Sequence, residues 1–220
     1  STVAQILGYE FPIHPDPIFL KAMEQKWTRS NVYCLVIDGV VEKMSEIEKI
    51  IYLLHEIKAP AILFSRGYSE EVLFTLSTNF ASGVLSIIPI VVPFDLEGIN
   101  MLNDIAVVLD TDVVSSLKGD LISQKNIDDM AVADEITISS ASTAIRSSSS
   151  LRRVVEHIKT IEEKKDDSSL AVLENDTNML LNKRIMSLTG RGVKITLGKN
   201  IGEKRGIILD RIQSLIRMFK

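Results

Sequence analysis

The chain has 220 residues, 45% of them hydrophobic and 25% charged, which is the balance of a folded globular protein and excludes a largely disordered one. Its net charge of −4 and its aromatic content of 5% argue against nucleic acid or an anionic membrane as a partner. No apolar run approaches the roughly 20 residues of a bilayer span. The single cysteine, Cys34, excludes an intrachain disulfide and favours a reducing compartment. We therefore expect a soluble, cytoplasmic protein that binds neither nucleic acid nor membrane.

The first 120 residues predict alternating strands and helices. Residues 1–30 are predicted to be irregular, because Pro12, Pro15 and Pro17 favour extended backbone and break helices. After them, short apolar runs alternate with segments whose apolar residues recur at helical spacing. The predicted strands are 32–37, 61–64, 84–92 and 106–109, and the predicted helices are 45–58, 69–83 and 96–105. This alternation is typical of an α/β layer structure.

Two helix starts have capping residues. Ser45 stands three residues before Glu48, the spacing of a capping box. Ser69 precedes two glutamates and opens the second helix. Both patterns predict where the chain turns from a loop into a helix.

The second half contains a serine-rich stretch with two open interpretations. Residues 139–150 are mostly Ser, Thr and Ala, which is typical of a flexible linker. Alternation over 132–138, together with Ile145, equally predicts an exposed pair of strands joined by a loop. Beyond it the predicted elements are helices at 151–165 and 178–188, a turn at 166–169, a strand at 193–197 and a last helix from about Gly206.

No local motif predicts catalysis. His14, His55 and His157 share no metal-ligand spacing. The stretch 192–199 has five residues between its glycines and lacks the Ser or Thr of a phosphate loop. We therefore expect no catalytic residue, no bound metal and no cofactor, and we predict that the chain is not an enzyme.

A series of short matches in one order resembles the apical domain of a group I chaperonin of the GroEL type. Met101-Leu102-x-Asp104-Ile105-Ala106 matches the Met-Leu-x-Asp-Ile-Ala of that family letter for letter. The other matches are Gly8-Tyr9 with Pro17-Ile18-Phe19, Glu42–Ile47, Ala59–Leu63, Glu71–Leu76 with Asn79, Gly83-Val84-Leu85, and Leu188-Thr189-Gly190 with Ile195 and Gly198. They occur in the family's order over a span of about 200 residues.

The resemblance implies a fold, two domains and a binding groove. The fold would be layered β-sheets flanked by helices over residues 1–187, followed by a strand and helix of an intermediate domain over 188–220. In the family, two apical helices form an apolar groove for unfolded polypeptides. The positions implied here are Ile18, Phe19, Ile51, Leu54, Leu73, Ser77 and Thr78. Without the resemblance, the spacing of Ile51, Leu54 and Leu73 favours core residues of amphipathic helices.

The sequence differs from the family in two ways, one in the groove and one in the nucleotide motif. Ser77 and Thr78 stand where the family has two valines, which reduces the apolar area of the groove. The nucleotide motif of the family, Gly-Asp-Gly-Thr-Thr, is not found in this sequence, and we predict no ATPase activity even though Asp210 falls where the family has a hydrolytic aspartate.

Two functions follow as hypotheses. In the first, the chain is an ATP-independent protein that holds exposed apolar segments of unfolded or partner polypeptides. In the second, it is a structural or assembly component, for example of a viral particle or an adaptor to a full chaperonin. Under either hypothesis, the last predicted helix would pack back on the domain or form a surface for self-association or for a partner, through Leu209, Ile212, Leu215, Ile216 and Phe219.

Overall fold

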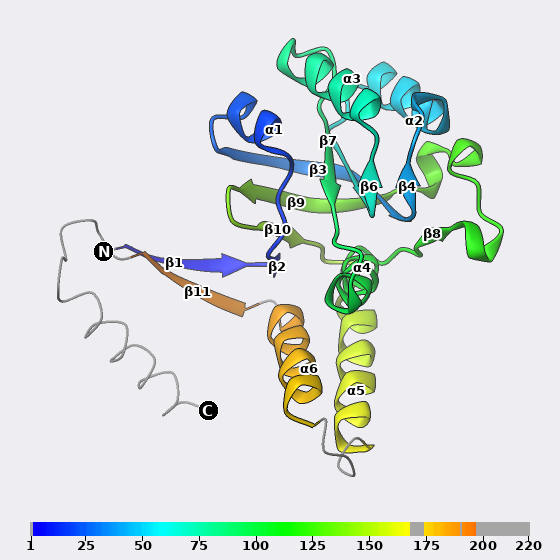
Figure 1. The fold of residues 1–220 in the computed structure, drawn as a ribbon. Coiled ribbons are helices and arrows are strands. Elements are labelled where there is room, and N and C mark those ends of the chain that lie inside the picture. The colour runs from blue at the N-terminus through cyan, green and yellow to red at the C-terminus, as the bar shows by residue number, and fades with distance from the viewer. Residues whose placement is uncertain (1, 168–173, 190, 197–220) are drawn as a thin grey trace. The chain divides into compact units, whose positions relative to one another are not determined.

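The computed structural model describes residues 2–167, 174–189 and 191–196 (Figure 1). By its contacts the chain divides into two units, one of residues 1–7 and 191–220 and the other of residues 8–190. In the described part of the first unit, β1 (Thr2–Leu7) pairs antiparallel with β11 (Arg191–Thr196), with Thr2 opposite Thr196. The predicted irregular start of the chain is therefore wrong at residues 2–7. The predicted division into 1–187 and 188–220 stays a prediction.

Residues 8–190 are built on one mixed sheet. Its strand order is β2-β10-β9-β3-β5-β7, and β8 pairs with β3. The pairs β3–β5 and β5–β7 are parallel, whereas β9 pairs antiparallel with both β3 and β10. The strands are β2 (Tyr9–Phe11), β3 (Lys26–Asp38), β5 (Ala61–Ser65), β7 (Ile87–Val91), β8 (Val114–Ser115), β9 (Ala131–Ser139) and β10 (Thr143–Arg146).

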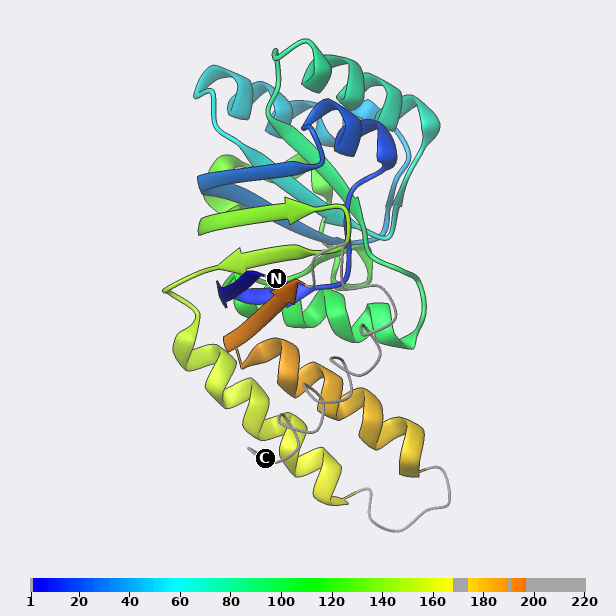
Figure 2. The ribbon, with the colours of Figure 1, turned by 90° about the vertical axis from the view of Figure 1, so that its left-hand side faces the viewer.

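Helices cover both faces of this sheet (Figures 1 and 2). One layer holds α1 (Pro17–Ala22), α2 (Met44–Glu56) and α3 (Glu70–Ala81). On the other side lies α4 (Leu96–Val108), against which α5 (Leu151–Asp167) and α6 (Glu174–Leu188) pack. Three short 3₁₀ turns, η1 (Ser116–Lys118), η2 (Ile122–Gln124) and η3 (Ile127–Asp129), connect β8 to β9, and the last two contact α2.

The core lies between the sheet and these helices. All five residues of β5 are buried, as expected for a central parallel strand covered on both faces. Cys34 of β3 is fully buried, and this burial raises the pKa of its thiol. Cys34 therefore acts as a small apolar core residue, as its position in an apolar run predicts.

The proline-rich segment contains a helix that the sequence analysis does not predict. Pro17 is the first residue of α1, a position where its fixed φ fits and its missing N–H is not needed. The Asp16 carboxylate accepts a hydrogen bond from the Ile18 backbone N–H at 2.9 Å. The prediction that these prolines only break helices is wrong, because proline is excluded from helix interiors but not from the first turn.

The start of α2 differs from the predicted capping box. The Glu46 carboxylate accepts hydrogen bonds from the backbone N–H groups of Glu42 at 3.0 Å and Lys43 at 2.8 Å. The N-cap is therefore Lys43, two residues before Ser45, and only the glutamate half of a capping box is present. For α3 the prediction is confirmed, because the Ser69 hydroxyl accepts a hydrogen bond from the Val72 N–H at 3.3 Å.

The predicted strand 106–109 is instead the end of α4. The run is apolar because α4 is covered by the sheet and by α5, so consecutive residues 104–108 are buried. A short apolar run does not distinguish a buried strand from a buried helix. The predicted strand 84–92 is shorter at its start, because Gly83 ends α3 with a φ of +72° and the chain reaches β7 only at Ile87.

The serine-rich stretch forms a strand pair. β9 and β10 are antiparallel, with Thr143 opposite Ile138, so the predicted strand pair is confirmed and the linker interpretation is wrong. The expectation that the pair is exposed is also wrong, because both strands lie inside the sheet and Ile138 and Ile145 are buried. The helices predicted at 151–165 and 178–188 and the strand predicted at 193–197 are also present, with shifted ends. The predicted turn at 166–169 is wrong at its first two residues, which belong to α5. The predicted last helix, from Gly206, lies outside the described residues.

A buried ionic cluster joins the three helices of the second layer. The Asp104 carboxylate on α4 accepts hydrogen bonds from Arg184 on α6, from Nε at 2.9 Å and from Nη2 at 2.6 Å. The same carboxylate lies 2.8 Å from Nε2 of His157 on α5. Asp104 is therefore fully paired although its side chain is only 3% exposed.

Candidate polypeptide-binding surface

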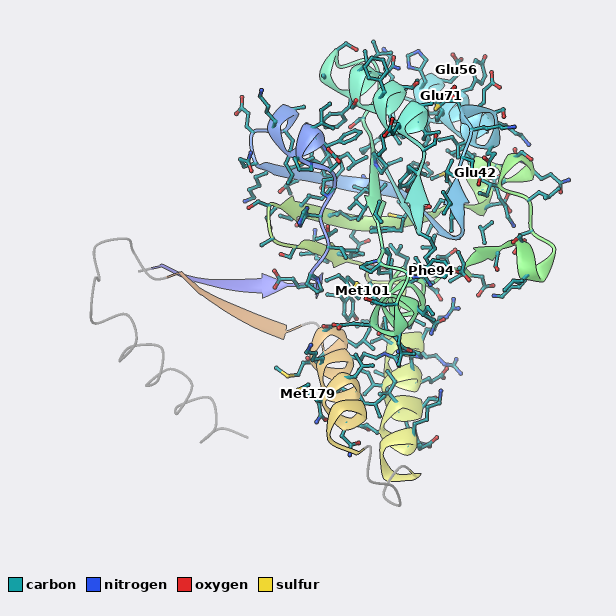
Figure 3. All side chains as sticks on the ribbon, viewed as in Figure 1. Glu42, Glu56, Glu71, Phe94, Met101 and Met179 are labelled. Carbon is teal, nitrogen blue, oxygen red and sulfur yellow. The ribbon has the colours of Figure 1, made fainter. Side chains whose placement is uncertain are left out.

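The helices α1, α2 and α3 form one continuous layer above the sheet (Figure 3). The short parallel strands β4 (Val40–Val41) and β6 (Gly67–Tyr68) lie side by side and lead into α2 and α3. At the other end of the helices, Nδ1 of His55 on α2 lies 3.3 Å from the carbonyl oxygen of Val84, just after α3. These contacts at both ends place α2 beside α3.

The helix α1 is held against α3 by aromatic packing. The rings of Phe19 and Phe80 lie 5.6 Å apart and are tilted by 58°. Phe19 is fully buried in this contact, whereas its neighbour Ile18 is 51% exposed. The short helix therefore carries an exposed apolar side chain on an element that packs against α3.

The structure separates the predicted site residues into three groups. Phe19, Leu54 and Ser77 are buried and cannot contact a bound chain in this conformation. Ile51 and Leu73 are half-buried, and Ile18 and Thr78 are exposed. For Leu54 the core interpretation holds, because it shares the inner stripe of α2 with Ile47 and Ile50.

Two exposed aromatic residues were missed by the sequence analysis. Tyr52 on α2 is 62% exposed and Phe74 on α3 is 71% exposed. Tyr52 stands two residues from both Ile50 and Leu54, which places it on the side of the helix opposite the buried stripe. Phe74 has the same spacing from Val72 and Leu76 on α3. The signal in the sequence is thus an aromatic residue on the polar side of an amphipathic helix.

The polar side chains of α3 hydrogen-bond to their own helix. The hydroxyls of Ser77 and Thr78 both donate to the Phe74 carbonyl oxygen, at 3.0 and 2.8 Å. The Thr75 hydroxyl donates to the Glu71 carbonyl oxygen and the Asn79 amide donates to that of Thr75, each at 2.8 Å. These donors would therefore keep their hydrogen bonds if a polypeptide covered α3.

The described part of the chain offers no metal centre. It contains no group of three or more His, Cys, Asp or Glu side chains arranged to hold an ion. Its described helices are also not long and apolar enough to span a membrane. The candidate site is the layer of α1, α2 and α3, where large apolar side chains are exposed.

Comparison with known proteins gives partial sequence relatives. No protein-family model matches the chain. Over 116 residues, 52% of this chain and 21% of the relative, it is 28% identical to the chloroplastic RuBisCO large subunit-binding protein subunit alpha of Brassica napus. Over 119 residues it is 32% identical to the Pisum sativum protein of the same name, again covering 52% of this chain and 20% of the relative. The chain thus spans about a fifth of the length of these curated relatives.

Solved structures extend the similarity to almost the whole chain. The chaperonin gp146 of bacteriophage EL 2 of Pseudomonas aeruginosa matches with a TM-score of 0.71 at 19% identity. The match covers 98% of this chain and 42% of that one. A second crystal form matches with a TM-score of 0.67 at 20% identity, over 96% and 41% of the two chains. The chain therefore has a GroEL-type chaperonin-like fold, and the predicted α/β class with helices flanking the sheet is confirmed.

Proposed function

We propose that this chain is an ATP-independent polypeptide-binding protein that holds exposed apolar segments of unfolded or partner proteins on the α1–α3 layer. A chaperonin-like fold supports a chaperone-related role. The observation that carries the proposal is the exposure of large apolar side chains on three neighbouring helices: Ile18, Tyr52 and Phe74. Exposed apolar patches of this kind mark interaction sites on soluble proteins.

The proposed surface differs in its residues from the one that the resemblance implies. Tyr52 and Phe74 take the place of Leu54 and Phe19 as the main contact residues. The half-buried Ile51 and Leu73 add apolar area beside them. Because apolar contacts are not directional, such a surface accepts many sequences.

The proposal does not require a nucleotide. Contact with the exposed side chains needs only that the helices are folded, and no step of that contact consumes energy. That the chain does not hydrolyse ATP stays a prediction. Self-association through the last predicted helix also stays a prediction, because that helix lies outside the described residues.

The proposal is tested by aggregation and binding assays without ATP. The purified chain is mixed near stoichiometry with a chemically unfolded protein, and light scattering records aggregation. Binding of a labelled, reduced and alkylated polypeptide is measured by fluorescence anisotropy for the wild type and for Phe74→Ser. Loss of one large apolar contact should weaken binding by about tenfold or more.

Phe94→Ser is the matched control for that variant. Phe94 precedes α4 and is 75% exposed, so the control makes the same change at similar exposure outside the α1–α3 layer. The control should bind like the wild type. Equal binding by the wild type, Phe74→Ser and Phe94→Ser would refute the proposed surface.

The burial of Leu54 and Phe19 favours a second candidate function, a structural or assembly component. Burial of these positions leaves a smaller apolar surface than a general polypeptide binder would use. Such a component would fail to suppress aggregation and would form a defined complex with itself or with one partner. Light scattering coupled to size-exclusion chromatography distinguishes the two candidates.

A further inference from the structure

The exposed aromatic residues of the α1–α3 layer are flanked by glutamates. On α2, Glu48 and Glu56 stand four residues before and after Tyr52. On α3, Glu70 and Glu71 stand four and three residues before Phe74. Residues at these spacings are neighbours on a helix surface, so carboxylates lie one turn from each ring.

All four glutamates are exposed, and none forms an ion pair within the described residues. Figure 3 labels two of them, Glu56 and Glu71, in the helical layer above the sheet. The described helix α3 contains no lysine, arginine or histidine. The lysines nearest in sequence on α2 and its ends are Lys43, Lys49 and Lys58.

Two other aromatic rings of the chain are in cation–π contact with an arginine of the same chain. The Arg66 guanidinium lies 5.5 Å from the Phe94 ring centroid, and Arg29 lies 5.6 Å from that of Trp27. Among the described residues, no cation stacks on Tyr52 or Phe74 in this way. An aromatic ring with carboxylates one turn away is suited to a lysine or arginine from another chain, through cation–π and ionic contacts.

We propose that the α1–α3 layer preferentially binds apolar segments that carry lysine or arginine beside their apolar side chains. This inference rests on the proposed function and adds the charge of the segment to it. The apolar side chain would contact Ile18, Tyr52 and Phe74, and the cation would lie between a ring and its neighbouring glutamates. Because these groups are exposed to solvent, the preference is modest and decreases with salt.

Three labelled peptides with the same apolar residues test the inference. Their polar positions are filled with Lys and Arg, with Gln, or with Glu, and binding is followed by anisotropy at low salt and at about 0.5 M NaCl. We expect the basic peptide to bind about fivefold more tightly than the Gln peptide at low salt. The acidic peptide should bind most weakly, and the differences should shrink at high salt.

A charge-matched pair of variants assigns the effect to the site. Glu70→Gln with Glu71→Gln should remove much of the preference for the basic peptide. Glu162→Gln with Glu163→Gln changes the same charge on α5 and should retain the preference. Equal binding of all three peptides, or the same loss in both double variants, would overturn the inference.

The Gln peptide separates this inference from the proposed function. If that peptide binds and Phe74→Ser weakens it, the proposed function stands whatever the charge preference is. If the Gln peptide does not bind, the proposed apolar surface fails. Binding of the basic peptide alone, unchanged by Phe74→Ser, would indicate a purely ionic contact and would overturn both proposals.

Discussion

Residues 8–190 contain two helical layers, and the helices within each layer are held together by different interactions. In the layer of α4, α5 and α6, charged side chains are paired internally, with Asp104, His157 and Arg184 in a buried cluster. At the rim of that layer, Arg153 pairs with Asp112 at 3.0 Å. In the layer of α1, α2 and α3, the contacts are mainly apolar, and the exposed rings of Tyr52 and Phe74 have no cation stacked on them among the described residues. Both layers bury core residues, but only the α4–α6 layer buries paired charges, and the exposed side of the α1–α3 layer is the surface that we propose for a partner.

The largest expected effect is at Leu54, which the resemblance places in the groove and the structure places in the core. Leu54→Glu should unfold the chain or destabilise it by about 4 kcal/mol or more, because it buries a carboxylate without a partner. Denaturant unfolding followed by fluorescence measures this, since the single tryptophan, Trp27, is buried. Tyr52→Glu is the control and should leave the midpoint unchanged. A folded Leu54→Glu variant that has lost only binding would show that Leu54 belongs to the surface.

Asp104→Asn tests the buried cluster of the other layer. Removing the carboxylate leaves the guanidinium of Arg184 buried without a counter-charge, which should cost about 3 kcal/mol of unfolding free energy. The matched change Asp112→Asn breaks an exposed ion pair and should cost at most about 0.5 kcal/mol. Similar values for the two variants, or weaker polypeptide binding by folded Asp104→Asn, would contradict the division of roles between the layers.

The smallest expected effect concerns the helix starts of the α1–α3 layer. Ser69→Ala removes the cap of α3 and should cost about 1 kcal/mol. Ser45→Ala should be nearly neutral, because Glu46 rather than Ser45 satisfies the free N–H groups at the start of α2. Unfolding free energies of both variants measure the difference. If Ser45→Ala lowers the unfolding free energy as much as Ser69→Ala does, the capping box predicted at Ser45 is supported.

Local sequence patterns predict some elements of this fold correctly and others not. The start of α3 at Ser69, the strand at 61–64 and the helix over 151–165 rest on local patterns and are confirmed. The predicted strand 106–109 fails because α4 is covered on two sides, so its sequence loses the period of an amphipathic helix. The helix at Pro17 is missed because its cap, Asp16, is a single residue within a proline-rich loop.

For the candidate site, sequence indicates the helices but not which of their side chains face solvent. Ile51 and Leu54 lie three residues apart on one helix, yet only Ile51 keeps part of its surface exposed. Ile18 and Phe19 are adjacent, and packing on Phe80 buries only the second. These outcomes depend on neighbours that are distant in the chain.

The sequence by itself determined the α/β alternation, most of the helices and strands, and the likeness to a GroEL-type chaperonin, because all of these follow from local spacing and short collinear matches. Only the tertiary structure decided that β9 and β10 pair, that Leu54 and Phe19 belong to the core, and that Tyr52 and Phe74 form the exposed surface. The reason is that burial is a property of packed layers. A helix pattern gives the direction of its apolar stripe, whereas the packing of α1, α2 and α3 on the sheet sets how much of that stripe is covered.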